Sequence, residues 1–180
     1  VTPQDTSDEL RIHCRFRVTH GGVRGINELP LAAHAQRWPF DYTTEERRDL
    51  GAMLERHYPD PDGRLFEWCR PFLAPAVRPD TRALLTSIAA AIQSSFRYEP
   101  RDEPGTQTPD ETLRRGAGSC RDFALLMMEV ARRLGMAARF VSGYLIQLTA
   151  DMKSLDGPSG PEKDFTDLHA WCEVYLPGAG

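Results

Sequence analysis

Residues 116–123 place a cysteine where it can act as a nucleophile. Ser119 suits the N-cap of the helix that the next residues predict, so Cys120 falls in the first helical turn. Unpaired backbone N–H groups and the positive end of the helix dipole favour a thiolate at such a position. The same N–H groups can hold the oxyanion that forms when a thiolate attacks a carbonyl. By itself, the pattern also fits an ordinary buried cysteine at the start of a helix.

A thiolate nucleophile needs a proton carrier, and His169 is the histidine best placed to supply one. It lies in a predicted strand whose alternation puts Asp167, His169, Trp171 and Glu173 on one face. The other histidines lie on or after a predicted strand, in a loop or on a helix: His13, His20, His34 and His57. We expect those four to be solvated or hydrogen-bonded side chains without a chemical role. The alternation alone is equally consistent with a His169 side chain that has no chemical role.

Three separated motifs, in this order, resemble the core of the transglutaminase-like superfamily, in particular its bacterial cysteine proteases. They are GSCRDFA at residues 118–124, RLGMAARFVSGY at 133–144 and DLHAWCEVY at 167–175, and Thr112 precedes them. The resemblance covers roughly residues 80–180. It implies a papain-like α+β core, with the nucleophile at a helix N-terminus packed on an antiparallel sheet that carries the histidine and an acid. By motif position, Cys120 corresponds to the family's nucleophile and His169 to its general base.

The resemblance also implies a third catalytic member, an Asp on the strand after the histidine strand, which orients the imidazole. Because 11 residues follow His169, we expect this Asp beyond Gly180 and expect the present chain to be weakly active or inactive. Asp167 and Glu173 are poor substitutes because they lie beside His169 on the same strand. A missing neighbour would leave an open edge on the strand at 168–176, through which two copies could form a homodimer.

The chemistry expected from this resemblance is thiol-dependent acyl transfer on peptide or carboxamide bonds. Cys120 would attack the carbonyl, His169 would move the proton, and water or an amine would resolve the thioester. We therefore interpret the chain first as a cysteine peptidase or amidase acting on a peptide or protein. Two alternatives stay open: protein-glutamine γ-glutamyl transfer, which shares the acyl-enzyme, and a non-catalytic protein-binding module with an inert thiol.

The composition argues against several other classes of function. The 180 residues include 22 Lys and Arg against 26 Asp and Glu, a formal net charge of −4, whereas nucleic acids and anionic membranes attract basic surfaces. No stretch approaches the roughly 20 apolar residues that span a bilayer, and no signal peptide is recognised, so we expect a cytoplasmic protein. The cysteines are widely spaced without a CxxC pair, so we expect no metal and no cofactor. Cys14, Cys69 and Cys172 are expected to be packing residues.

The elements that must position Cys120 and His169 follow from the hydrophobic pattern. Helices are expected at residues 43–57, opened by a capping box of Thr43 and Glu46, and at 65–69, 80–96 and 119–134. Strands are expected at 10–18, 138–149 and 168–176, a solvated loop at 99–110 and a hairpin connection at 153–161. This order indicates an α+β fold, with a strand-and-helix extension at 1–75 and a C-terminally incomplete catalytic core at 76–180.

Several residues near the motifs have mainly structural interpretations. Asp122 follows the N-cap by three residues and is expected to bind backbone N–H groups at the helix start. Trp171 is expected either to exclude water near the site or to belong to the core. Tyr98 could donate its hydroxyl to an oxyanion, but a structural role is favoured. Arg133 and Arg139 are expected at the surface or in ion pairs.

Overall fold

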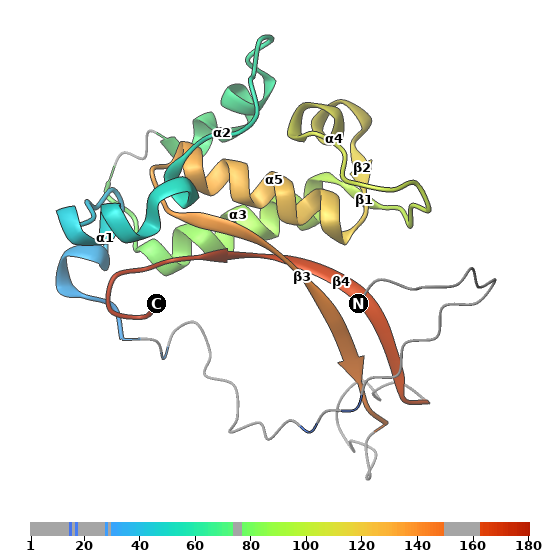
Figure 1. The fold of residues 1–180 in the computed structure, drawn as a ribbon. Helices are drawn as coiled ribbons and strands as arrows, with labels where there is room; N and C mark the ends of the chain where they lie inside the picture. Colours follow the sequence, from blue (N-terminus) through green and yellow to red (C-terminus); the bar gives the residue numbers. More distant parts are fainter. Residues whose placement is uncertain (1–14, 16, 18–27, 29, 74–76, 150–162) are drawn as a thin grey trace, which may run out of the picture.

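The computed structural model describes residues 15, 17, 28, 30–73, 77–149 and 163–180. Figure 1 shows helices packed together above two long antiparallel strands, β3 (Ala138–Gln147) and β4 (Phe165–Val174). The predicted α+β class is confirmed. Of the strand expected at 10–18, Arg15 and Arg17 are described and neither is in a regular element, while Cys14 and the others lie outside the described residues.

Helix α1 (Thr44–Leu50) begins at the predicted capping box. The Thr43 hydroxyl accepts from the Glu46 N–H at 3.2 Å, and the Glu46 carboxylate accepts from the Thr43 N–H at 2.8 Å. The expected continuation to residue 57 is wrong, because the chain leaves the helix at Gly51, where φ is +40°. Glycine adopts this conformation without strain, and a short 3-10 turn, η3 (Gly51–Leu54), follows.

Helix α2 (Arg64–Leu73) is longer than the expected turn at 65–69 and runs through Pro71. The Asp60 carboxylate holds its first turn by accepting from the N–H groups of Leu65 and Phe66 at 3.1 and 2.9 Å. Leu65 and Cys69 are buried in the core. The helix therefore continues past a residue that normally ends one, because its apolar face is packed.

The two helices with the clearest apolar stripes are confirmed. Helix α3 (Thr81–Ser95) has Asp80 as its N-cap, which accepts from the Ala83 N–H at 3.0 Å. Helix α5 (Cys120–Arg133) follows its N-cap Ser119, as predicted. Both helices contribute their apolar residues to one hydrophobic cluster. The nucleophile candidate therefore stands at the end of a helix that is fixed by the core.

A short parallel strand pair precedes α5 and was not predicted. Strand β1 (Arg97–Tyr98) pairs with β2 (Ala117–Gly118). The N–H groups of Arg97 and Glu99 donate to carbonyl oxygens of residues 116 and 118, both at 2.9 Å. Strands of two residues are too short to show alternation, so no pattern in the sequence could reveal them.

The loop expected at 99–110 ends sooner than predicted, because helix α4 (Pro109–Arg115) begins within it. Thr108 caps this helix through its hydroxyl, which accepts from the Glu111 N–H at 3.2 Å. Pro109 contributed to the loop prediction, yet proline is well suited to the first helical position. The loop is also less solvated than expected, since Gln107 is 2% exposed.

Strands β3 and β4 pair antiparallel over their whole described lengths, from Ala138 opposite Val174 to Gln147 opposite Phe165. Their bounds confirm the two predicted strands with shifted ends. The register puts His169 opposite Gly143. The expected hairpin connection at 153–161 lies outside the described residues.

The segment at residues 30–43, before α1, is hydrogen-bonded to residues 134–137, which follow α5, and to residues 175–177, which follow β4. The Trp38 indole donates to the Leu134 carbonyl at 2.8 Å, and the Ala32 N–H donates to the Pro177 carbonyl at 2.7 Å. The Tyr42 hydroxyl accepts from the Ala137 N–H at 2.9 Å and donates to the Tyr175 carbonyl at 3.0 Å. Other residues of the predicted extension at 1–75 belong to the same hydrophobic cluster as α3 and α5: Leu31, Leu65 and Cys69. A domain boundary near residue 75 stays a prediction.

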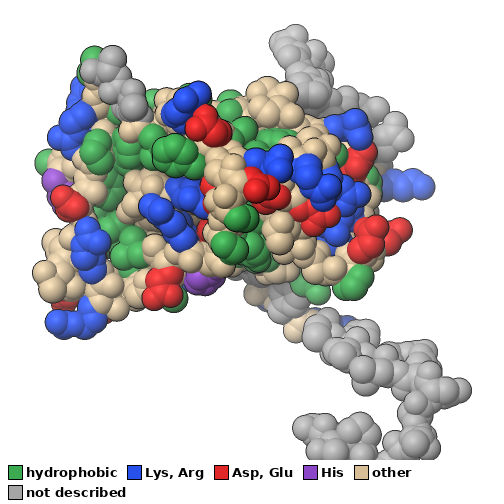
Figure 2. Space-filling model, turned by 90° about the horizontal axis from the view of Figure 1, so that it is seen from above, with side chains coloured by type: hydrophobic (Ala, Val, Ile, Leu, Met, Phe, Trp, Pro, Cys, Tyr) green, Lys and Arg blue, Asp and Glu red, His purple; other side chains and the backbone are tan. Residues whose placement is uncertain are grey.

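The charged side chains of both signs are mixed on the described surface (Figure 2), as the small net charge of the sequence suggests. Figure 2 shows basic and acidic side chains interspersed over one face of the molecule. None of the helices in the described part of the chain is long and apolar enough to cross a membrane.

Candidate active site

Asp122 fixes the start of α5. Its carboxylate is fully buried: Oδ2 accepts from the N–H and hydroxyl of Ser119 at 2.8 and 2.9 Å. Oδ1 accepts from the Gln107 N–H and the Arg101 guanidinium, each at 2.7 Å. Burial by itself would raise the pKa of Asp122, but the hydrogen bonds from Ser119 and Gln107, with that from Arg101, hold it below its usual value. The predicted role of Asp122 at the helix start is confirmed.

The neighbouring Arg121 binds the same loop to the helix. Its guanidinium donates to the carbonyl oxygen of Arg101 at 3.0 Å and to that of Glu103. Arg101 is therefore held at two points, through its carbonyl by Arg121 and through its side chain by Asp122. The loop over residues 99–107 is thus a wall whose position depends on the first turn of α5.

Gly118 allows β2 to approach α5 closely. A β-carbon at this position would lie 2.9 Å from Cβ of Asp122 and 3.3 Å from Cε1 of Phe123. Because β2 leads directly into Ser119 and Cys120, a larger residue would displace the start of the helix. Gly118, the glycine of the GSC motif, therefore lets β2 pack closely against α5.

Cys120 is the first residue of α5 and a half-buried free thiol. The N–H groups of Asp122 and Phe123 both donate to the Ser119 carbonyl, at 3.0 and 3.1 Å. The N–H groups of Cys120 and Arg121 lie at the helix start, where no earlier turn supplies a carbonyl. This arrangement can present a thiol and backbone donors to the same substrate carbonyl.

Strand β4 carries His169, which is half-buried. Its register confirms the predicted alternation, with His169 and Trp171 on one face and Ala170 and Cys172 on the other. Ala170 is 7% exposed, and Cys172 packs against the hydrophobic cluster that contains α5. Residues of both faces contribute to the hollows described next.

Two hollows meet at the point where α5 begins. We call them the polar hollow, of about 570 Å³, and the apolar hollow, of about 370 Å³. Three residues line both of them: Cys120, His169 and Ala170. The structure therefore brings the two predicted site residues to one location. Ala170 was not singled out from the sequence, because its place at the two hollows depends on how β4 lies against α5.

The polar hollow is lined by the loop at 99–107 and by the strands. Tyr98 and Asp167 both contribute to it, together with Arg101, Arg121 and Ser142. Tyr98 is 59% exposed and reaches this wall through the pairing of β1 with β2, which places it opposite Gly118. Tyr98 is thus an exposed residue of the hollow that Cys120 also lines.

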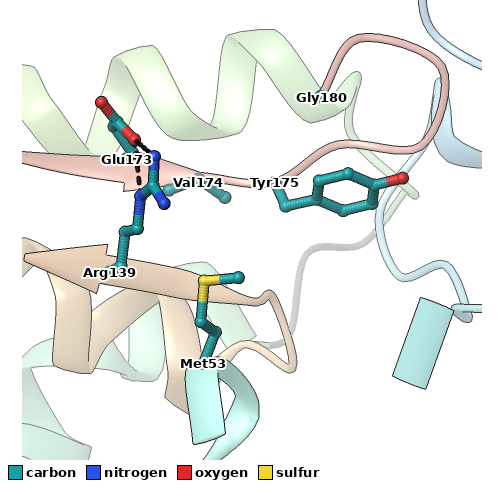
Figure 3. Close-up of a pocket in the computed structure, with 6 residues that line it drawn as sticks. All are labelled: Met53, Arg139, Glu173, Val174, Tyr175 and Gly180. Atoms are coloured by element: carbon teal, nitrogen blue, oxygen red, sulfur yellow. Dashed lines mark hydrogen bonds and ion pairs between the residues drawn. The ribbon is translucent and has the colours of Figure 1, made fainter. Parts of the chain in front are cut away.

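Glu173 belongs to a different environment. Its carboxylate accepts from the Arg139 guanidinium at 2.7 Å and from the Trp171 indole at 3.1 Å. The hydrogen bonds from Arg139 and Trp171 lower the pKa of Glu173. Both members of the Arg139 pair line a third hollow of about 420 Å³, which Figure 3 shows beside Met53 and Tyr175. Neither Cys120 nor His169 lines this hollow, so Glu173 is an ion-paired strand residue, as expected.

The other described cysteines are packing residues, as predicted. Burial raises the pKa of the Cys69 thiol to about 11 and that of Cys172 to about 12. Both are free, and a buried neutral thiol is a poor nucleophile. Within the described residues, no three His, Cys, Asp or Glu side chains gather in a way that could hold a metal ion.

Comparison with known proteins gives the following similarities. Residues 73–180 match the Transglutaminase-like superfamily. Uncharacterized proteins of Mycobacterium bovis and Mycobacterium tuberculosis are 30% identical over 112 residues, which is 60% of this chain and 33% of each relative. The match thus spans about a third of the length of these curated relatives. The solved structure of a putative cysteine protease from Cytophaga hutchinsonii aligns with 21% identity and a TM-score of 0.48, covering 72% of this chain and 39% of that one.

Proposed function

Because the chain belongs to the transglutaminase-like superfamily, we propose that it is a thiol-dependent acyl-transfer enzyme, and most specifically a cysteine peptidase or amidase. The observation that carries this proposal is that Cys120 and His169 line the same two hollows at the N-terminus of α5. A thiol at a helix start, backbone donors beside it and an imidazole at the same hollow are the parts that acyl transfer requires.

In the proposed reaction, the Cys120 thiolate attacks the carbonyl carbon of a peptide or carboxamide. The oxyanion is held by the N–H groups at the start of α5, and the imidazolium of His169 gives its proton to the departing amine. The carbon–nitrogen bond breaks and a thioester remains on Cys120. Water then attacks the thioester while His169 accepts its proton, and the carbon–sulfur bond breaks. This step releases the carboxylic acid and restores the Cys120 thiolate and the His169 imidazolium.

Part of the same proposal concerns the acid that orients His169. Neither Asp167, which lines the polar hollow, nor Glu173, which is paired with Arg139, is assigned this role. We assign it to an Asp on a strand after Gly180. A chain extended by one turn and one strand should gain activity on a generic peptide or amide, since an orienting acid contributes up to about 10⁴ in rate.

The proposal is tested by alkylation with iodoacetamide at pH 6, read for each cysteine by peptide mass spectrometry. Cys120 should react at least about tenfold faster in the folded protein than in the urea-unfolded chain, because an ordinary thiol is almost fully protonated at this pH. Cys69 and Cys172 are internal controls and should react more slowly in the folded protein, since burial raises the pKa of both thiols. Equal rates for Cys120 in the folded and unfolded chain would contradict the proposal.

A further inference from the structure

The apolar hollow is built from one face of α5. Cys120, Phe123, Ala124 and Met127 all line it, and their spacing of three, four and seven residues places them on one side of a helix. Cys120 stands at the end of this row. A substrate held at its thiol therefore lies next to a strip of apolar side chains.

The walls of the hollow are supported from behind. Phe123 contacts Phe96 with ring centroids 5.9 Å apart, and Phe96 contacts Trp68 at 6.2 Å. Ile92 of α3 lines the hollow and is 7% exposed. Because these side chains are held by the hydrophobic cluster, the hollow is a preformed feature of the core surface.

The chemistry of the lining favours an apolar occupant. Four lining residues carry a polar atom in the side chain: His169, Cys120, Cys172 and Trp171, whose indole N–H already donates to Glu173. The other lining residues within the described chain have apolar side chains, and none of the lining residues is Lys, Arg, Asp or Glu. A polar group placed against Phe123, Ala124 and Met127 would lose water without gaining a partner, whereas an apolar group would gain from burial. The polar hollow on the other side of Cys120 offers Arg121, Asp167 and Ser142 instead.

We propose that the apolar hollow is a specificity subsite for a bulky apolar side chain next to the bond that Cys120 attacks. The inference rests on the proposed function and narrows its substrate class to peptides or amides with a leucine-, methionine- or phenylalanine-like group at that position. The occupant is the substrate itself, because the hollow shares Cys120, His169 and Ala170 with the polar hollow. The remainder of the substrate chain lies in the polar hollow.

Two electrophiles of matched shape test the subsite: N-(3-methylbutyl)iodoacetamide and N-(3-amino-3-oxopropyl)iodoacetamide. In each, the thiolate displaces iodide, so that a carbon–sulfur bond forms and a carbon–iodine bond breaks. The isopropyl end of the first and the carboxamide end of the second have nearly the same size. The quantity measured is the rate with the apolar reagent divided by the rate with the polar reagent. This rate ratio at Cys120, divided by the same ratio for free glutathione, should be about 10.

Ala89 gives a way to fill the hollow without changing Cys120. It lies on α3, is exposed and lines the hollow, so Ala89→Phe should reduce the rate ratio to about 1. Ala89→Leu, a smaller change, should give an intermediate ratio. Ala90→Phe is the matched control, because Ala90 is the next residue of the same helix, is also exposed and does not line the hollow. It should retain the full ratio.

A ratio near 1 in the unchanged protein, or a full ratio in both Ala89 variants, would overturn the subsite. Failure of the proposed function appears separately, as slow alkylation of Cys120 by plain iodoacetamide at pH 6. In that case the ratio is still measured at pH 8.5, where an ordinary thiol reacts. The failure of the subsite and the failure of the proposed function can therefore be told apart.

Discussion

The guanidinium of Arg101 lies 2.7 Å from the carboxylate of Asp122, which is fully buried at the start of α5. Asp122 also accepts from the Ser119 and Gln107 N–H groups, so it joins the helix, its N-cap and the loop at 99–107. The polar hollow beside Cys120 is thus shaped by one ion pair and its hydrogen bonds. Removing the charge of Asp122 tests how strongly this loop is held.

Asp122→Asn should lower the free energy of unfolding by about 3 kcal/mol, because it leaves the largely buried Arg101 with only the exposed Glu103 carboxylate, at 3.5 Å, as a charged partner. Asp110→Asn is the matched control, since Asp110 pairs with Arg64 at 2.9 Å but at an exposed site, and should cost at most about 1 kcal/mol. Urea unfolding at pH 7 measures both. Equal losses in the two variants would show that burial of the Asp122 pair adds nothing.

The same carboxylate predicts a pH dependence. The pKa of Asp122 is lower in the folded protein, so its contribution is complete above the unfolded value of about 3.9 and is lost as the pH falls through the folded value. Unfolding followed from pH 5 downward should therefore show a decline in stability that is weaker in Asp122→Asn. An identical decline in the variant would assign it to other carboxylates.

His169→Ala should slow the alkylation of Cys120 at pH 6 by about tenfold or more, because the imidazole at the same two hollows is the group proposed to take the proton of the thiol. The rate should be recorded against pH for both proteins. His34→Ala is the control, because His34 is exposed on η2 (Ala33–Ala35) and does not line either hollow. An unchanged profile in His169→Ala would remove the imidazole from the proposed mechanism.

Gly143→Ala should move the ring of Trp171. A β-carbon at Gly143 would lie 2.8 Å from Cη2 of this indole, which is 39% exposed and can shift, so the substitution should cost about 1 kcal/mol. Trp171→Phe removes the part of the ring that meets the added carbon, and the double variant should recover about 1 kcal/mol. Urea unfolding of the four proteins measures the coupling. Additive losses of stability would show that the Trp171 ring does not interact with the added carbon at position 143.

Tyr42→Phe should lower the free energy of unfolding by about 1 to 3 kcal/mol, because it leaves the buried Ala137 N–H without its acceptor. Burial raises the pKa of Tyr42 to about 12, above the usual 10, so stability should fall as the pH rises from 10 to 12, and this fall should be weaker in the variant. Tyr144→Phe is the control, since Tyr144 is 66% exposed, and should change stability by less than about 0.5 kcal/mol. A loss in Tyr144→Phe as large as that in Tyr42→Phe would contradict this account.

The sequence predicted the parts of the site that local pattern determines. An N-cap, a helical stripe and a strand alternation placed Cys120 and His169 on the correct kinds of element, because each signal lies within a few residues. The short β1–β2 pair and the bond between Arg101 and Asp122 could not be predicted, since their partners are about twenty residues apart and no periodicity links them. The same holds for the role of Ala170, which depends on how β4 lies against α5.

The bonds between the segment before α1 and the last residues also affect the order of events during synthesis. The Tyr42 hydroxyl donates to the carbonyl of Tyr175, which lies 133 residues later. At about 5 to 20 residues per second, that separation corresponds to roughly 7 to 27 s, during which α3 and α5 can form and pack before the Tyr42 hydroxyl meets the Tyr175 carbonyl.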